Sequence, residues 1–297
     1  MNFNIRKILV PVDCSETGKL ALEHASFLAR LAKADLHLMH VMPAMEYHFE
    51  IPEPVMRIEN HAQVNKIVEQ KLAELVEEVR INYGCKATAS FSNGKVAHEI
   101  VEEVKEENID LIIMGTHGAS GFEEFFIGSN AHKVVTVAPC PVITVQTHAV
   151  KLGFTNIVLP IDRTLHSREK TEYAIALAKL FMAKIHIVGL LEEDEDHGNE
   201  KLQIVLDQVQ HAIEKADVLF SRHTIKGDNL AVEALKYGAS VNADLIVIMT
   251  EHESEMSGIF LGPRAKQIVN HSKIPVLSIK PSDGKFADLD MGGAYTF

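Results

Sequence analysis

Residues 110–118 read DLIIMGTHG, and residues 244–252 read DLIVIMTEH. Outward from these two stretches the likeness continues in the same order along the chain. Residues 7–13 read KILVPVD and residues 156–162 read NIVLPID. The period is too long for a solenoid repeat, so we interpret the chain as a tandem duplication of a whole domain.

The duplication predicts the domain organisation. A chain of 297 residues has the length of about two average domains. The stretch THAVKLG at 147–153 lies between the last strand of one copy and the first strand of the next. We therefore expect one domain at 1–148, a second at 153–281, and a C-terminal tail at 282–297.

Short β-branched runs alternate with helical patterns inside each copy. KILVPVD is a continuous apolar run, which suits a strand buried on both faces. The residues from Ser15 to Ala34 follow with apolar positions on one side, as in an amphipathic helix, and Ser15 suits the N-cap. Strand and helix alternate to the end of the copy. This pattern predicts an α/β fold with five parallel strands per domain, in which ligands bind outside the carboxyl ends of the strands.

A glycine-rich loop follows the fourth predicted strand of the first copy. Gly115 and Gly118 come directly at the end of the strand, and Gly128 and Ser129 precede the next helix. Glycine lets the backbone approach a ligand closely, and a helix N-terminus offers free N–H groups and a positive dipole end. The loop lacks the Gly-Lys-Ser/Thr of a P-loop. We interpret it as a phosphate cradle; the alternative is that its glycines only permit a tight turn.

The spacing Gly-x2-Gly-x9-Gly-Ser resembles the ATP-binding signature of the universal stress protein family. KILVPVD, DLHLMHV at 35–41 and APCPVITV at 138–145 resemble other segments of that family. The resemblance covers essentially 1–150, and it extends over 151–280 in layout but not in the loop. It implies two tandem Rossmann-like domains of the adenine nucleotide alpha hydrolase-like kind, with ATP and Mg²⁺ in the first. It also implies pairing through the last strands, within one chain as a pseudo-dimer or between chains as a homodimer.

The resemblance further implies roles for individual residues. Asp13 faces the adenosine part of the ligand, with capping of the next helix as its alternative role. Pro11 and Val12 line the adenine pocket, and the backbone of Val41 reads the adenine edge. Met114 packs on the base; for Val41 and Met114 an ordinary core role is the alternative. The predicted cofactor-binding residues are Pro11, Val12, Asp13, Val41, Met114, Gly115, His117, Gly118, Gly128, Ser129 and Asn130.

The second copy has the layout of the first but not its loop. Asp162 keeps the acidic residue after the first strand. Met249, His252 and Pro263, however, stand where the first copy has two glycines and the serine. Side chains now occupy the path of a phosphate, and proline at a helix start removes an N–H donor although the fold tolerates it. We predict that the second copy does not bind ATP in the manner of the first.

Charge and composition indicate which classes of binding partner and which compartment to expect. The formal net charge of -12 and the absence of a Lys/Arg-rich run argue against a nucleic-acid partner. Three cysteines stand far apart with no Cys-x-x-Cys, which favours a reducing compartment. No apolar run approaches membrane-spanning length, so a membrane partner is not expected and we predict a cytoplasmic location.

Catalytic and metal signals are weak. His37 and His40 are three apart on a predicted strand, so they point to opposite faces and make a poor metal pair. No Gly-x-Ser-x-Gly occurs at a strand end, and no residue is predicted to be catalytic; His117, inside the loop, either reaches the phosphates or faces solvent. The metal ligands stay unknown. The sequence favours a nucleotide-responsive regulatory module in stress response. A slow ATP hydrolase, or a scaffold that binds no nucleotide, stays open as an alternative.

Overall fold

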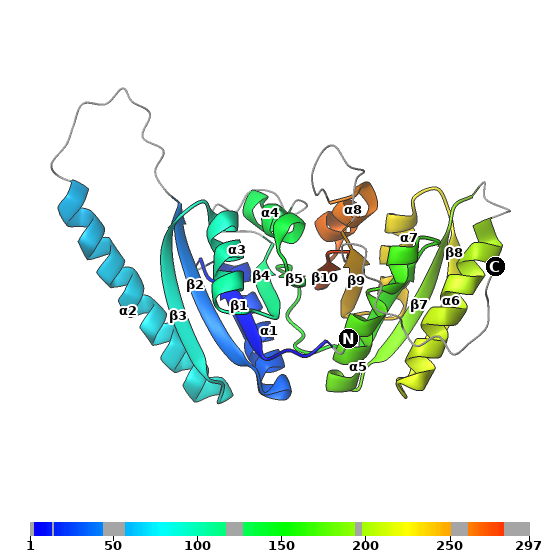
Figure 1. Ribbon diagram of the computed structural model, residues 1–297, viewed down its shortest axis with the longest axis horizontal. Coiled ribbons are helices and arrows are strands. Elements are labelled where there is room, and N and C mark those ends of the chain that lie inside the picture. Colours follow the sequence, from blue (N-terminus) through cyan, green and yellow to red (C-terminus); the bar gives the residue numbers. More distant parts are fainter. Residues whose placement is uncertain are drawn as a thin grey trace, which may run out of the picture.

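The computed structural model describes residues 3–13, 15–43, 57–116, 127–193, 198–250 and 261–281. Figure 1 shows two units of the same architecture side by side, which we call the first copy (β1–β5) and the second copy (β6–β10). The first copy consists of β1 (Lys7–Pro11), α1 (Glu16–Ala32), β2 (Asp35–Pro43), α2 (Arg57–Tyr83), β3 (Ala87–Gly94), α3 (Val96–Glu106), β4 (Leu111–Gly115), α4 (Ser129–Val137) and β5 (Val142–Val145). The predicted alternation of strand and helix is confirmed.

The second copy repeats this order with one local difference. It consists of β6 (Asn156–Ile161), a short 3₁₀ helix η1 (Leu165–Arg168), α5 (Thr171–Phe181), β7 (Lys184–Leu191), α6 (Gly198–Lys215), β8 (Phe220–Lys226), α7 (Leu230–Ser240), β9 (Leu245–Met249), α8 (Pro263–His271) and β10 (Val276–Ile279). Whereas α1 starts soon after β1, the corresponding helix α5 starts only after the 3₁₀ turn. Among the described helices, none is both long and apolar enough to cross a membrane.

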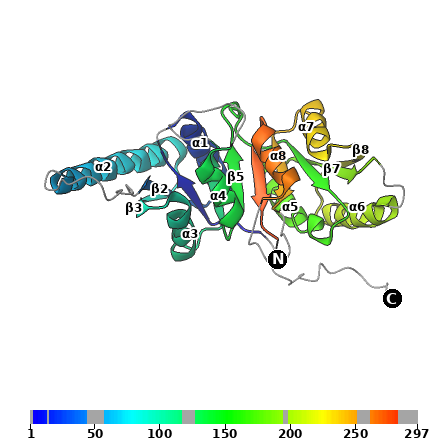
Figure 2. The ribbon, with the colours of Figure 1, turned by 90° about the horizontal axis from the view of Figure 1, so that it is seen from above.

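All ten strands join in one sheet with the order β3-β2-β1-β4-β5-β10-β9-β6-β7-β8. Within each copy the neighbouring strands run parallel, which confirms five parallel strands per domain. The copies join where β5 pairs antiparallel with β10, with Ile143 opposite Leu277. Figure 2 shows these two strands next to each other at the centre of the molecule. The last strands of the two copies thus cover each other's edges.

Two layers of helices cover the sheet, and each layer encloses a core that continues through both copies. The core under α1, α2, α5 and α6 includes Ile143 of β5 and Leu277 of β10. The core under α3, α4, α7 and α8 includes Val142 and Val276 of the same two strands. Because the apolar side chains continue across the junction, the two copies are held as one body by packing as well as by strand pairing.

The connection between the copies is itself packed. Phe154 contacts Phe181 of α5 edge to face, with ring centroids 4.9 Å apart, and Phe181 stacks at 6.2 Å on Phe27 of α1. Gly153 has a φ of +81°, and a Cβ there would lie 2.9 Å from the Phe27 ring. Only glycine suits that position, because both the backbone conformation and the space exclude a side chain. The aromatic cluster fixes α1 and α5 against each other.

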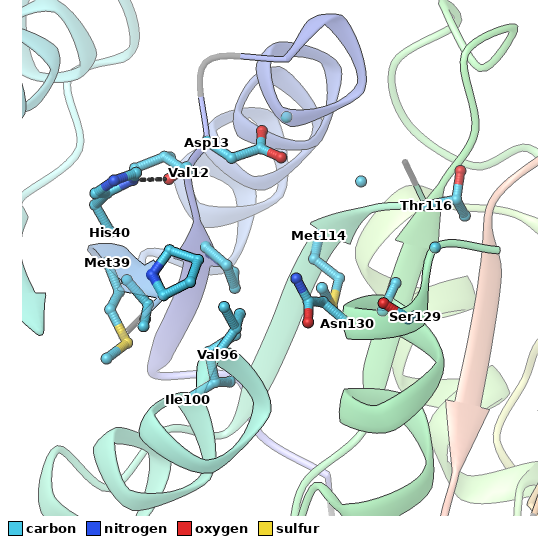
Figure 3. A pocket seen from close by; sticks show the side chains of 17 residues that line it. Val12, Asp13, Met39, His40, Val96, Ile100, Met114, Thr116, Ser129 and Asn130 are labelled. Atoms are coloured by element: carbon cyan, nitrogen blue, oxygen red, sulfur yellow. Dashed lines mark hydrogen bonds between the residues drawn. The ribbon is translucent and has the colours of Figure 1, made fainter. Parts of the chain in front are cut away.

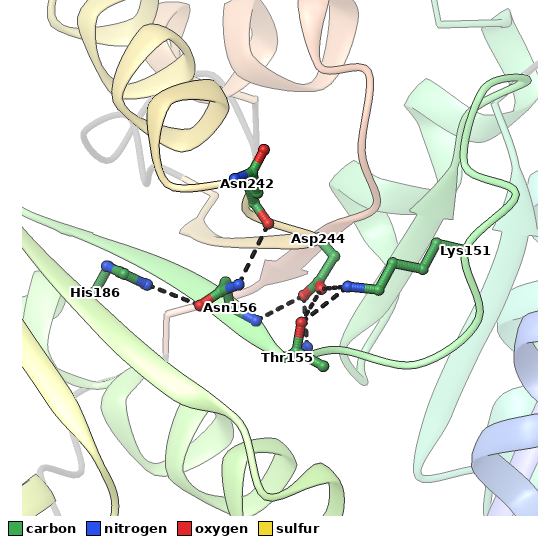
Figure 4. Close-up of polar contacts among 6 residues, drawn as sticks. All are labelled: Lys151, Thr155, Asn156, His186, Asn242 and Asp244. Carbon is green, nitrogen blue, oxygen red and sulfur yellow. Dashed lines mark hydrogen bonds and ion pairs between the residues drawn. The ribbon is translucent and has the colours of Figure 1, made fainter.

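In each copy an aspartate just before the fourth strand accepts hydrogen bonds from the backbone at the start of the first strand. In the second copy the buried Asp244 carboxylate accepts hydrogen bonds from the backbone N–H of Thr155 at 2.8 Å and of Asn156 at 3.0 Å, and from Lys151 Nζ at 2.6 Å (Figure 4). In the first copy Asp110 accepts from two backbone N–H groups at the start of β1 in the same way. The duplicated sequence therefore preserves a duplicated structural joint.

Replacing Asp244 by alanine is expected to lower the free energy of unfolding by about 2–4 kcal/mol, because two backbone N–H groups lose their acceptor. Urea denaturation measures this change. Lys151→Met is the matched control: its side chain is largely exposed, so we expect a loss below about 1 kcal/mol. Equal losses in the two variants would contradict the role given to the backbone contacts.

Candidate functional site

The order of the strands reverses between β1 and β4, and a cavity of about 300 Å³ lies there at their carboxyl ends (Figure 3). This is the switch point at which parallel α/β sheets bind ligands. Of the eleven residues predicted from the sequence, His117 and Gly118 lie outside the described residues. The other nine line the cavity together: Pro11, Val12, Asp13, Val41, Met114, Gly115, Gly128, Ser129 and Asn130.

The N-terminus of α4 opens into this cavity. Gly128 is the N-cap, and its N–H donates to the carbonyl of Thr116 at 2.7 Å. The first bond inside the helix runs from the N–H of His132 to the carbonyl of Gly128. No described side chain caps the N–H groups of the three residues before His132, and all three residues line the cavity. Uncapped N–H groups and the positive end of the helix dipole make this wall a place for an anion.

Asp13 follows β1 and forms another part of the cavity wall. Its carboxylate accepts from the backbone N–H of Ser15 at 3.0 Å and from the Ser15 hydroxyl at 2.5 Å. Ser15 is the N-cap of α1, since its Oγ accepts from the N–H of Gly18 at 3.0 Å. The capping role considered for Asp13 therefore belongs to Ser15, and Asp13 supports the cap while its carboxylate faces the cavity.

The end of β2 presents backbone groups to the same space. The carbonyl of Met39 accepts from the N–H of Val12 at 2.8 Å, just beyond the last residue of β1. Met39 and Val41 are two residues apart on β2, so their backbone N–H and C=O groups point to the same side, toward β1. Because β1 ends at Pro11, opposite Met39, the N–H and C=O of Val41 lie beyond the end of β1. The neighbouring His40 links the ends of β2 and β1, because its Nδ1 lies 2.6 Å from the carbonyl oxygen of Val12. Val41 is thus placed to pair with a planar ligand edge.

Apolar side chains form the remaining walls. Met114 is 6% exposed and belongs to the core, and it also lines the cavity; its packing on a base stays a prediction. Met39 of β2 and Val96 and Ile100 of α3 were not predicted, yet they line the cavity as well. A signal for the last two was present: α3 follows directly on β3, so its first turn has to border the carboxyl edge of the sheet.

Gly115 has a packing role that is separate from any ligand. A Cβ at this position would lie 2.7 Å from Thr17 Oγ1 and 2.8 Å from the Thr17 carbonyl carbon, in the first turn of α1. In the second copy Met249 occupies the matching position, and there η1 replaces that first helical turn. The glycine therefore lets α1 begin close against the end of β4.

The variant Gly115→Ala is expected to lower the free energy of unfolding by about 1–3 kcal/mol, because the backbone of α1 cannot yield as a flexible side chain would. Gly238→Ala is the control: its Cβ would find no atom closer than 3.7 Å, and alanine favours the helix in which it lies. Thermal unfolding compares the two. A control that loses as much stability as Gly115→Ala would show that the clash is not the cause.

The second copy contacts the site of the first. Asn270 of α8 accepts, through its Oδ1, a hydrogen bond of 3.2 Å from the N–H of Ile127, the residue before the N-cap of α4. One turn further, burial and the nearby charge of Lys266 on α8 lower the pKa of His132 on α4. Helix α8 of the second copy therefore contacts the start of α4, whose N–H groups line the cavity.

His37, one of the two histidines considered as a metal pair, has structural partners, and so does its counterpart His186. The ring of His37 lies 2.8 Å from Thr88 Oγ1 through Nδ1 and 2.6 Å from Glu103 Oε1 through Nε2. His186, at the matching position of the second copy, bonds Asn156 and Ser221. Both histidines are buried structural residues of β2 and β7. Within the described ranges, no three His, Cys, Asp or Glu side chains come together as a metal site.

The doubled, mostly parallel sheet with its helices on both faces defines the class: a tandem pair of Rossmann-like α/β domains. The model of the universal stress protein family matches residues 4–146 and 153–280, and the chain belongs to that family. The predicted resemblance is thereby confirmed.

Three known proteins show the extent of the likeness. The universal stress protein YxiE of Bacillus subtilis is 32% identical over 148 residues, which span 47% of this chain and 98% of that protein. A universal stress protein of Methanocaldococcus jannaschii is 29% identical over 160 residues, spanning 49% of this chain and 98% of that one. The crystal structure of a universal stress protein from Archaeoglobus fulgidus covers 92% of this chain and 98% of its own at 20% identity, with a TM-score of 0.74. The last of these shows that the two-copy fold is shared.

Proposed function

We propose that the first copy binds ATP together with Mg²⁺, and that the protein is a nucleotide-responsive regulatory module of the stress response. The observation that carries the proposal is the N-terminus of α4, where uncapped N–H groups line a cavity at the switch point of the sheet. The family supplies the physiological setting. The predicted domain boundaries and the cytoplasmic location belong to the same proposal.

The parts of the cavity match the parts of an adenine nucleotide. Apolar side chains of β2, α3 and β4 suit a base, and the backbone of Val41 suits its hydrogen-bonding edge. Asp13 offers a carboxylate at the level of the ribose, and the first turn of α4 offers N–H donors for the phosphates. A volume of about 300 Å³ is within the range of small-molecule sites.

The residues present also suit the metal in a limited way. Mg²⁺ is held in proteins by one or two oxygen ligands together with waters and substrate phosphates. The Ser129 hydroxyl and the Asp13 carboxylate are oxygen donors on the cavity wall. Mg²⁺ bound with the nucleotide would neutralise phosphate charge, which matters in a chain whose formal net charge is -12.

Two measurements test the proposal. Mass spectrometry of the small molecules released on denaturing the purified protein is expected to show an adenine nucleotide. Calorimetry on the stripped full chain is expected to show micromolar binding of ATP–Mg²⁺ and weaker binding of GTP, since Val41 reads the base edge. A protein that carries no nucleotide and binds no ATP at about 1 mM would be a scaffold instead. Steady release of phosphate from ATP would make it a slow hydrolase.

A further inference from the structure

The second copy keeps a cavity at the carboxyl ends of β6 and β9 and lines it differently. Its volume is about 610 Å³, compared with about 300 Å³ in the first copy. Leu190, Ile248 and Ile268 form apolar walls, while Ser167 and Lys170 contribute polar groups. The described residues of the second copy therefore still border a cavity where the first copy has its site. The lining gives this cavity a different chemistry.

Lys170 is the unusual residue of this cavity. It matches Ala21 of the first copy, at the same offset that relates Asp162 to Asp13, and it is 5% exposed. Burial lowers the pKa of Lys170 to about 8 against the opposing influence of Asp162. The ammonium group has three N–H donors, and within the described part of the chain one of them has an acceptor, Ser167 Oγ at 3.2 Å. A buried cation with spare donors suits a further acceptor beyond those that the described residues supply.

Ser167 offers a second donor beside the lysine. Its Oγ accepts from the N–H of Asp162 at 3.0 Å and from Lys170. Both of these bonds use the oxygen as acceptor, so the hydroxyl hydrogen remains to be donated. The ammonium and this hydroxyl lie on the same wall of the cavity.

The other charges at the site are already paired. Arg264, in the first turn of α8, forms an ion pair with Glu192 after β7 and lies 3.8 Å from the carboxylate of Asp162. Burial alone would raise the pKa of Asp162, but Lys170, hydrogen bonds from Thr164 and the charge of Arg264 together lower it, so Asp162 is ionised. His166 of η1 is the further titratable residue on the cavity wall. The charge of Lys170 also interacts with Asp162, but its hydrogen bond among the described residues goes to Ser167, so its other N–H donors can engage a ligand.

The lining selects the kind of anion. A triphosphate would meet the carboxylate of Asp162, and α8 begins with Pro263, which has no N–H to donate. The spare N–H donors of one ammonium group suit a single carboxylate, and the apolar walls suit a carbon body. We propose that the cavity of the second copy binds a small organic monocarboxylate, whose oxygens accept hydrogen bonds from Lys170 and Ser167 while its apolar part lies against Leu190, Ile248 and Ile268.

Calorimetry of the full chain with hexanoate and with benzoate tests this site. At least one of the two is expected to bind with a dissociation constant below about 1 mM, and hexan-1-ol, benzyl alcohol and inorganic phosphate at least tenfold more weakly. Lys170→Met is expected to weaken carboxylate binding at least tenfold, about 1.4 kcal/mol. Ser167→Ala is expected to weaken it about threefold to tenfold through loss of one hydrogen bond.

Lys179→Met, on the exposed side of the same helix α5, is the matched control and is expected to bind as the wild type does. Failure of both carboxylates to bind at about 10 mM would overturn the proposal, and so would equal binding by Lys170→Met or by the alcohols. If Lys170→Met does not fold, the Ser167→Ala result decides. ATP affinity is measured in each variant and is expected to stay unchanged, so the two proposed sites succeed or fail separately.

Discussion

Replacing Ser129 by proline is expected to lower the affinity for ATP by at least about a hundredfold while leaving the stability of the fold unchanged. Ser129 is the first residue of α4, and its N–H and hydroxyl both lie at the cavity. Proline removes the two donors at once, and a hydrogen bond to a charged group is worth about 1.5–3 kcal/mol. The fold tolerates the change because Pro263 starts α8 at the matching position.

Two further variants make this result specific. Ser129→Ala removes the hydroxyl but keeps the N–H, so we expect a smaller loss than for proline if the backbone donor matters most. Pro263→Ser restores the donor in the second copy, and the stoichiometry of ATP binding is expected to stay at one, because Met249 and the Arg264 ion pairs remain. Calorimetry gives affinity and stoichiometry, and thermal unfolding gives stability. Full ATP affinity in Ser129→Pro would remove α4 from the phosphate site.

The second large effect concerns Lys170 and pH. The difference in the free energy of unfolding, wild type minus Lys170→Met, is expected to rise by about 3 kcal/mol between pH 7 and pH 11. The pKa of Lys170 is lowered from 10.5 in the unfolded chain to about 8 in the fold. Below pH 8 both states carry the charge, so the folded state bears the whole cost of burying it. Between about 8 and 10.5 the unfolded chain binds more protons, and a rise in pH therefore favours the folded state.

Urea denaturation of both proteins across this pH range measures the difference. Groups that titrate in both proteins, such as the tyrosines and cysteines, largely cancel in it. Lys179→Met serves again as the control, because an exposed lysine is expected to give a difference that does not change with pH. A flat profile for Lys170→Met would mean that the ammonium is not buried, which would also remove the basis for a carboxylate site.

The local sequence pattern predicts the architecture and the position of the first site. KILVPVD, DLHLMHV and DLIIMGT predict buried parallel strands, and parallel strands bring their carboxyl ends to one edge. Strand order therefore predicts the edge at which ligands bind, and the family resemblance assigns Asp13, Val41 and Ser129, which are far apart in the sequence, to that edge. Nine of the residues that the family resemblance implied line the cavity, and they lie at the ends of β1, β2 and β4 and at the start of α4.

The chain by itself thus determined the duplicated fold, the edge at which ligands bind, and the difference between the two loops, since these depend on periodicity and on residues adjacent in sequence. Only the tertiary structure decided the packing of Gly115 against Thr17, the burial of Lys170, and the bracing of α4 by Asn270. A lysine at the start of a helix is ordinarily exposed, and nothing nearby in the sequence shows that this one is buried. Burial is a property of contacts between distant segments, and it determines which donors and charges remain available to a ligand.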